Sequence, residues 1–116
     1  MQFMFLIYSQ EGSEPQPGTD EFGPLIGAYM AFTEKMKDEG KFVSGEGLQP
    51  VSTATTLSIR EGKTHTVDGP FAETKEQLGG YYLLDVTDLD EAMKCAAEIP
   101  TASYGRIEIR PVAVFD

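Results

Sequence analysis

The 116-residue chain is poor in several residue types on which protein chemistry often depends: it has one cysteine, one histidine and no tryptophan. A single cysteine cannot form an internal disulfide, and we expect a cytoplasmic protein. One histidine with scattered carboxylates gives none of the spacings typical of a metal site, so we expect no bound metal. Walker, Rossmann and nucleophile-elbow motifs are also absent, and the sequence predicts no cofactor.

Basic residues are scarce as well. Nine Lys and Arg oppose 19 Asp and Glu, which gives a formal net charge of -10. This charge repels phosphate backbones and anionic membrane surfaces, so we expect no direct nucleic-acid binding and no membrane binding. The apolar run at residues 1–8 is too short for a membrane span or a signal-peptide core and is predicted to be a strand.

Alternating side chains predict strands at residues 2–8 and 81–86, both of them apolar on two faces. Glu61-Gly62 is a two-residue hairpin signal, and counting outward from it pairs Ser58 with His65. The remaining strands are expected at residues 42–48, 55–60, 63–67 and 105–115.

Two helices are predicted from apolar spacing and end signals. The first begins near Pro24 and ends before Gly40, because Pro suits the first turn and Gly suits the residue after the last. The second begins after Asp88, which forms a capping box with Glu91, and is ended by Pro100.

The element order predicts an α+β, ferredoxin-like β-α-β-β-α-β fold with an inserted β-hairpin, as one domain spanning residues 1–116. Two helices of this length cover only one face of the antiparallel sheet. Because residues 2–8 and 81–86 are apolar on both faces, we expect an obligate homodimer that packs sheet to sheet around an apolar space.

One connection carries more information than any other, the run DGPFAETKEQLGG from Asp68 to Gly80. Gly accepts positive φ, Pro fixes φ, and Asp can accept bonds from downstream amides, so the backbone shape is closely specified. This run, with Tyr81-Tyr82 after it, resembles the signature of the DGPF group of YCII-related proteins. The resemblance continues through residues 3–8, 44–48, 90–92, 104–105 and 108–112.

The resemblance implies a dimeric α+β barrel of ferredoxin-like subunits and a small enzyme similar to the monooxygenases and isomerases of that fold. Some family members are credited with a catalytic His and Asp pair, with the His near the first helix. In this chain residues 22–36 contain no His, and His65 lies on the predicted hairpin. Members of the DGPF group often occur beside genes for extracytoplasmic-function sigma factors, which implies a regulatory or stress context.

Asp68 and His65 are the candidate catalytic residues. A carboxylate at the rim of an apolar cavity can act as a general base, and His alone titrates near neutrality without help. The structural alternatives are that Asp68 accepts amides of its own turn, which turn chemistry favours, and that His65 is a half-exposed strand residue. Asp68 is only three residues after His65, so the strand end could bring the two together.

The charged part of the same run supplies two candidate ligand contacts, Glu73 and Lys75. With Glu76 they could provide an acid, a base and a cation that stabilises an enolate-like charge. Surface charges on loops are more often solvated or paired with one another. Phe71 is a third candidate contact, by stacking on a ligand, although an anchor that pins the loop to the core is the simpler interpretation.

Tyr8 and Arg110 complete the candidate ligand contacts. Both come from strands expected to border the space between two sheets, where aromatic core packing and salt bridges also account for such residues. The same expectation covers Tyr81, Tyr82 and Arg106.

Two functions remain open at this point. The first is a cofactor-independent enzyme of the lyase or isomerase type, in which Asp68 and His65 move protons on a small molecule while Lys75 or Arg110 stabilises negative charge. The second is a non-catalytic metabolite-sensing or accessory regulatory module, which the small number of convergent ionisable groups favours. The polar segment 9–20 is a surface loop that could close over a ligand.

Overall fold

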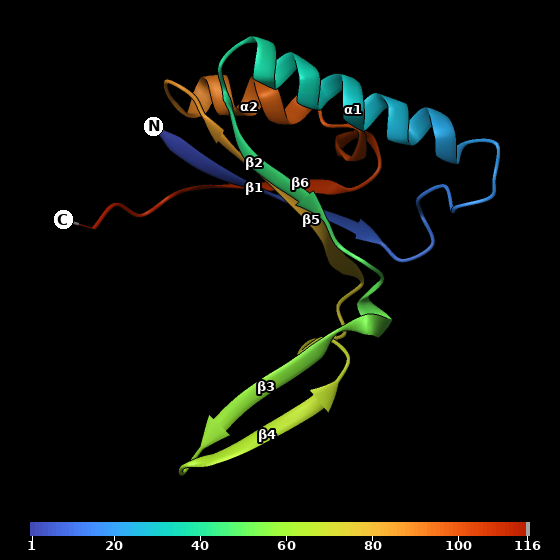
Figure 1. Ribbon diagram of the computed structural model, residues 1–116, viewed down its shortest axis with the longest axis vertical. Helices are drawn as coiled ribbons and strands as arrows, with labels where there is room; N and C mark the ends of the chain where they lie inside the picture. Colours follow the sequence, from blue (N-terminus) through green and yellow to red (C-terminus); the bar gives the residue numbers. More distant parts are fainter. Residues whose placement is uncertain (116) are drawn as a thin grey trace.

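The computed structural model describes residues 1–115 and shows two helices, six strands and two short 3-10 turns. These are β1 (Gln2–Gln10), α1 (Phe22–Asp38), β2 (Phe42–Gly47), η1 (Val51–Thr53), β3 (Thr55–Arg60), β4 (Lys63–Asp68), β5 (Glu76–Asp85), α2 (Leu89–Ala97), η2 (Pro100–Ser103) and β6 (Arg106–Pro111). The main sheet has the antiparallel order β2-β5-β1-β6, and β3 and β4 form a separate hairpin. Both helices cover one face of the main sheet (Figure 1). The predicted α+β, ferredoxin-like plan with an inserted hairpin is confirmed.

Helix α1 ends where glycine predicted it. Gly40 has φ 71°, a left-handed conformation that suits glycine, and its amide donates to the carbonyl of Lys37 at 3.0 Å. The amide of Lys41 then donates to the carbonyl of Met36 at 2.9 Å, so the last turn of the helix is closed. The helix begins at Phe22, two residues before the predicted Pro24.

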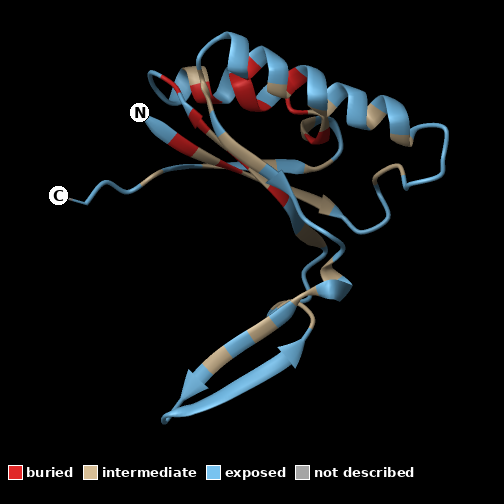
Figure 2. Cartoon of the chain, viewed as in Figure 1, coloured by how far each residue is buried: buried red, intermediate tan, exposed pale blue. Residues whose placement is uncertain are grey.

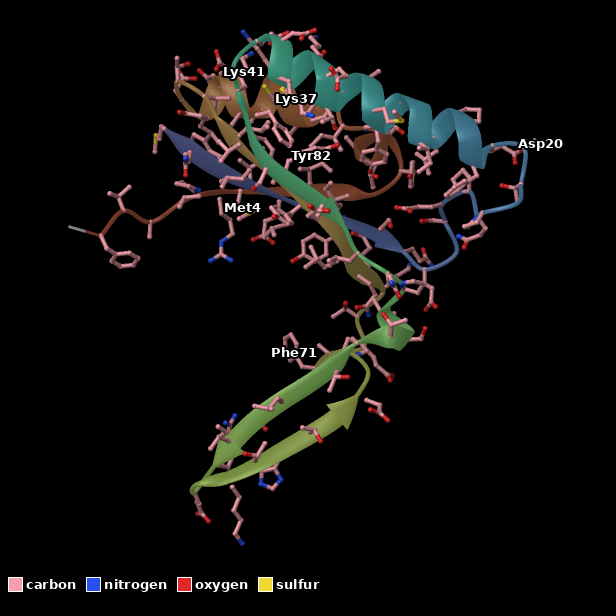
Figure 3. All side chains as sticks on the ribbon, viewed as in Figure 1. Met4, Asp20, Lys37, Lys41, Phe71 and Tyr82 are labelled. Carbon is pink, nitrogen blue, oxygen red and sulfur yellow. The ribbon has the colours of Figure 1, made fainter. Side chains whose placement is uncertain are left out.

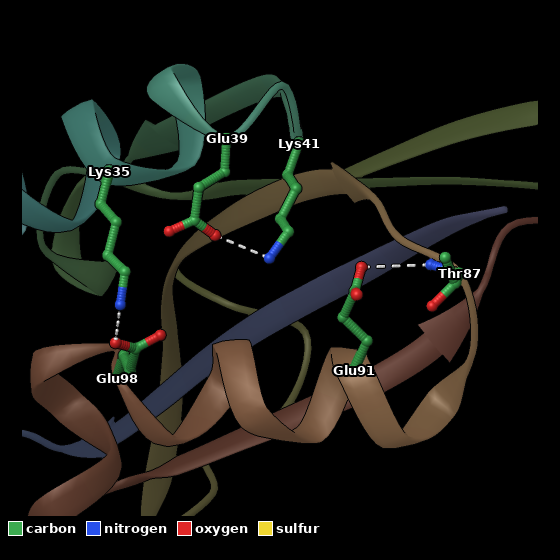
Figure 4. Close-up of polar contacts among 6 residues, drawn as sticks. All are labelled: Lys35, Glu39, Lys41, Thr87, Glu91 and Glu98. Carbon is green, nitrogen blue, oxygen red and sulfur yellow. Dashed lines mark hydrogen bonds and ion pairs between the residues drawn. The ribbon is translucent and has the colours of Figure 1, made fainter.

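Helix α2 begins at the predicted capping box. The Asp88 carboxylate accepts the amide of Glu91 at 2.9 Å. The Glu91 carboxylate in turn accepts the amide of Thr87 at 3.2 Å (Figure 4). An ion pair joins Lys35 of α1 to Glu98, the residue that follows α2. No helix among residues 1–115 is long and apolar enough to cross a membrane.

The core lies between the helices and one face of the sheet (Figure 2). Alternation in β1 buries Phe3, Phe5 and Ile7 on this face, and Phe5 lies opposite Tyr82 of β5 and Ile109 of β6. The other buried core residues are Phe32, Met36, Leu84, Val86, Ala92, Cys95, Ala96 and Ile99.

The second face of the sheet, called here the open face, carries the other half of the alternation. Met4, Leu6 and Tyr8 are half-buried there, and Tyr81 and Leu83 of β5 pair opposite Leu6 and Met4. No helix within residues 1–115 covers this face (Figure 1). It therefore exposes apolar side chains in the single chain, as the sequence predicted.

Tyr82 lies on the face opposite to the one expected. It is buried on the helix side, with its ring 5.0 Å from that of Phe32 in an edge-on arrangement, whereas Met4 points away from the helices (Figure 3). The expectation that Tyr82 borders a space between two sheets is wrong. A strand that is apolar on both faces gives no sequence signal for which tyrosine turns inward.

The β3-β4 hairpin projects from the sheet on the side opposite to the helices (Figure 1). Its register is as predicted, with Ser58 opposite His65, and positive φ at Glu61 (51°) and Gly62 (76°) gives the expected tight turn. Every residue of β4 is exposed, and Leu57 and Ile59 of β3 are 59% and 58% exposed. Most of the hairpin therefore projects into solvent from the part of the chain that the structure describes.

Candidate functional site

Glycines meet on the helix-facing side of β2 and β5. Gly47 pairs with Gly80, and Gly45 pairs with Tyr82. A Cβ on Gly45 would lie 2.6 Å from the Tyr82 ring, and one on Gly80 would lie 2.8 Å from the Glu46 carbonyl oxygen. Side chains are therefore sterically excluded at Gly45 and Gly80, and this end of the sheet is a floor of bare backbone.

Helix α1 extends over the glycine floor. Its C-terminal half buries Phe32 and Met36, but Phe22, Leu25 and Tyr29 of the N-terminal half are only half-buried. The space below them is a cavity of about 400 Å³, which we call the helix–sheet pocket. Its walls are largely apolar and include Ile26 and Phe42, with Gly45, Gly47, Gly79 and Gly80 on the floor side.

Hydroxyl groups supply part of the polar lining of the helix–sheet pocket. The Thr33 hydroxyl donates to the Tyr29 carbonyl at 2.9 Å and lies 2.8 Å from the Tyr82 hydroxyl. The Tyr29 hydroxyl is bonded to Thr101, which is fully buried. Burial raises the pKa of Tyr29 to about 12 and also raises the pKa of Tyr82. Both tyrosines are therefore neutral at physiological pH.

One carboxylate comes to this pocket from the loop between β1 and α1. Glu14 lines the pocket, is half-buried, and accepts the Ser9 hydroxyl at 2.9 Å through Oε1. Burial raises the pKa of Tyr104, as it does that of Tyr29, and the charge of Glu14 adds to both shifts. The loop that the sequence suggested as a lid thus contributes a functional group to the pocket.

A second cavity, the hairpin-base pocket, has a volume of about 610 Å³. It lies where the hairpin leaves the sheet, between Tyr8 and Leu78 of the sheet and Pro50, Ala54 and Phe71 near the hairpin. No Asp, Glu, Lys, Arg or His among residues 1–115 lines it. The lining of this cavity is mostly apolar, with Tyr8 and a few threonine and glutamine side chains as its polar groups.

A family model described as the YCII-related domain matches residues 1–116. The chain belongs to the YCII-related family. It is 37% identical over 117 residues to the uncharacterised protein R00369 of Rhizobium meliloti (strain 1021), a match that covers 99% of this chain and 94% of that protein. The family-level resemblance predicted from the Asp68 to Gly80 run is thereby confirmed.

Among solved structures, this YCII-related protein is similar to the 5-chloro-2-hydroxyhydroquinone dehydrochlorinase TftG from Burkholderia phenoliruptrix AC1100, in a complex with 2,5-dihydroxybenzoquinone. The TM-score is 0.52 at 15% identity, and the match covers 97% of this chain and 94% of that one. At this identity the likeness shows a shared fold.

The predicted catalytic residues lie on the exposed hairpin. His65 and Asp68 both belong to β4 and are solvent-exposed, and residues three apart on a strand point to opposite faces. The single chain therefore does not bring them together, nor does either line one of the two pockets described above. A catalytic role for them remains a prediction.

The turn after β4 is held by its backbone. The Gly69 amide donates to the Ala54 carbonyl at 2.7 Å, and the Thr56 hydroxyl donates to the Gly69 carbonyl at 2.8 Å. The Asp68 carboxylate accepts no hydrogen bond from residues 1–115, so the expected amide bonds to it do not form. Phe71 is 90% exposed, and the interpretation of this ring as an anchor to the core is wrong (Figure 3).

The charged candidates do not converge in the single chain. Glu73 and Lys75 are exposed, whereas Glu76 accepts the Arg106 guanidinium at 3.2 Å. Arg110 lies on β6 opposite Met4 and 3.7 Å from Glu108. Of the predicted ligand contacts, Tyr8 and Phe71 share the hairpin-base pocket. No group of three or more His, Cys, Asp or Glu within residues 1–115 is arranged to hold a metal ion.

The helix–sheet pocket was missed at the level of sequence, although its signal was present. Glycines occur in pairs at two predicted strands, Gly45 and Gly47 within the strand at 42–48 and Gly79 and Gly80 directly before the strand at 81–86. Pairing these strands next to each other would have predicted a floor without side chains beneath an apolar helix. Glu14 carried no signal, because its place depends on the path of an irregular loop.

Proposed function

We propose that this YCII-related protein is a small cofactor-independent enzyme of the lyase or isomerase type that acts in the helix–sheet pocket. The observation that carries the proposal is a cavity of about 400 Å³ over a glycine floor, with an apolar helix above it and the Glu14 carboxylate beside it. Mostly apolar cavities of this size with a few polar groups are typical of small-molecule sites. Membership of the family and a fold shared with a dehydrochlorinase support the same kind of role.

Glu14 is the residue to which we assign proton transfer. An ionised carboxylate at the edge of an apolar cavity can accept a proton from a bound molecule. In an elimination, the electron pair left behind forms a double bond while the leaving group departs with its own pair. In an isomerisation, the pair moves to a second carbon, which takes up a proton. Both reactions balance without an oxidant or a cofactor.

The assignment can be tested by proton exchange with para-hydroxyphenylacetone in deuterated water, followed by proton NMR. Wild-type protein is expected to accelerate loss of the methylene proton signal, because a positioned base removes the proton next to the carbonyl. Glu14→Gln is expected to lower the rate by about 10²–10⁴-fold, the usual contribution of a general base. Glu11→Gln is the matched control, since Glu11 lies on the same loop, is exposed and does not line the pocket.

Equal rates for Glu14→Gln and wild type would contradict the role of Glu14. Saturation-transfer NMR that shows the probe bound, with no exchange above that of buffer, would instead favour the second function. In that case the pocket serves a metabolite-sensing or accessory regulatory module, for which the sigma-factor context of the DGPF group offers a setting. A cytoplasmic location remains a prediction for either function.

We also propose that the chain assembles as a homodimer. Its accessible surface is 8107 Å², whereas a folded monomer of 12.7 kDa is expected to expose about 6,200 Å². The radius of gyration of 16.2 Å likewise exceeds the value of about 13 Å expected for 116 residues. The excess of about 1,900 Å² per chain is of the size that obligate dimers bury.

The hairpin and the open face are the surfaces that a second copy would cover. An isolated two-stranded hairpin is marginally stable in water, so exposed Leu57 and Ile59 support an interface along this arm. The β3-β4 hairpin and the open face border the hairpin-base pocket, which a second subunit would fill or close. In such a dimer, His65 and Asp68 of one subunit could line a pocket only if that pocket belonged to the other subunit.

A further inference from the structure

We infer that the helix–sheet pocket selects neutral ligands that donate hydrogen bonds, such as phenols, enols and aromatic amines, and rejects carboxylates. The inference rests on the proposed use of this pocket and names the class of molecule it takes. It follows from which polar side chains of the pocket can still donate a hydrogen bond to a ligand and which can only accept one.

Tyr82 presents an acceptor. Thr33 has one hydroxyl proton, which it donates to the Tyr29 carbonyl at 2.9 Å. The contact of 2.8 Å between the Thr33 and Tyr82 hydroxyls then requires the Tyr82 proton. With that proton used inside the protein, the Tyr82 oxygen offers the pocket only a lone pair.

Glu14 presents a second acceptor. An ionised carboxylate has no proton to donate, and the Ser9 bond occupies only Oε1. Oε2 has no hydrogen-bond partner among residues 1–115, so it is available to a ligand proton. Tyr29 is hydrogen-bonded to Thr101, so among the hydroxyls of Thr33, Tyr29 and Tyr82 only that of Tyr29 can still donate to a ligand.

No positive charge balances these acceptors. Among residues 1–115 no Lys, Arg or His lines the pocket, and the chain has a formal net charge of -10. A carboxylate ligand would lose its water and lie near Glu14 without a cation, which is costly. A hydroxyl or amino group on a ring can instead donate to Glu14 or Tyr82 while the ring contacts the apolar wall.

The test compares hydroquinone with para-hydroxybenzoate, which replaces one hydroxyl of the same ring by a carboxylate. Calorimetric titration of the wild-type protein is expected to show that para-hydroxybenzoate binds at least about tenfold more weakly, as one like-charge contact in a desolvated site implies. Glu14→Gln is expected to remove most of this difference in affinity between the two ligands, because the glutamine amide is neutral and can donate a hydrogen bond to a carboxylate. Glu11→Gln should leave the gap unchanged.

A second variant tests the account of the Tyr82 proton. Thr33→Val removes the acceptor that holds this proton, so Tyr82 becomes a donor and the affinity for acetophenone, which only accepts, is expected to rise several-fold relative to hydroquinone. Thr33→Ser retains the hydroxyl and should behave as wild type. Thermal unfolding of both variants establishes that they are folded.

The outcomes separate this inference from the proposed function. If para-hydroxybenzoate binds as well as hydroquinone, or if Glu14→Gln keeps the gap, the ligand class is wrong although the pocket is used. If hydroquinone binds unchanged when Gly47→Val fills the floor of the pocket, both the ligand class and the proposed site are wrong. Failure of wild type to bind any of the three probes also contradicts both.

Discussion

Gly47→Val is expected to weaken binding in the helix–sheet pocket at least about tenfold without loss of stability. Gly47 lies on the floor opposite Gly80, has no positive φ, and has no atom within 4 Å of the position that a Cβ would take. A valine side chain therefore fits without moving the backbone, but it places three carbons in the space that a ligand needs. Few positions in a fold allow function and stability to be separated so directly.

The magnitude follows from this open environment. Replacing glycine by valine inside a strand is expected to raise the free energy of unfolding by about 1 kcal/mol. The gain comes from the reduced conformational freedom of the unfolded chain and from the preference of valine for strands. For a domain of this size that corresponds to a rise in melting temperature of about 4 °C. Ligand affinity should fall at least about tenfold, because the side chain occupies part of a cavity of about 400 Å³.

Differential scanning calorimetry and hydroquinone titration measure the two effects on the same samples. Gly27→Val is the matched control, since Gly27 is exposed on α1 and does not line the pocket. Gly80→Val would place its Cβ 2.8 Å from the Glu46 carbonyl oxygen. This variant is expected to have a free energy of unfolding about 1–3 kcal/mol lower than that of the wild type. A Gly47→Val protein that binds hydroquinone normally, or that is less stable than wild type, would refute this reasoning.

Three further predictions concern the fold and the assembly. Asp88→Ala removes the cap that accepts the Glu91 amide and should lower the free energy of unfolding by about 1 kcal/mol in a urea titration, with no such loss for Asp90→Ala. Stability should fall as pH rises from about 10 to 12, because a tyrosine ionises near 10 in the unfolded chain whereas burial raises the pKa of Tyr29 to about 12. Tyr29→Phe should flatten that decline in pH-dependent denaturation, and an unchanged slope would contradict it. Leu57→Lys with Ile59→Lys should give a folded monomer by light scattering at micromolar concentration, whereas a wild type that is already monomeric would refute the dimer.

Much of the fold could be predicted because its signals are local. The hairpin register follows from the Glu61-Gly62 turn alone, and the start of α2 follows from Asp88 and Glu91. Gly40 ends α1 because only a left-handed residue closes that turn. Each of these features depends on residues within a few positions of one another, so the sequence contains what decides them.

The errors arose where long-range contacts decide the outcome. Tyr81 and Tyr82 are indistinguishable within a strand that is apolar on both faces, and only pairing with β1 turns Tyr82 toward the helices. Phe71 in a closely specified turn was expected to be buried, yet it is 90% exposed. Gly47 and Gly80 come from distant segments, and only the sheet places them together.

The central claim is that ligands bind between α1 and the glycine floor. The most direct test follows the backbone amide NMR signals of the full chain during addition of hydroquinone. The account predicts that the largest shifts occur at Gly47, Gly79, Gly80 and Tyr29, with little change on β4. If the largest shifts occurred around His65, Asp68 or Phe71 and the glycine floor were unaffected, the claim would be contradicted. The ligand would then bind at the hairpin.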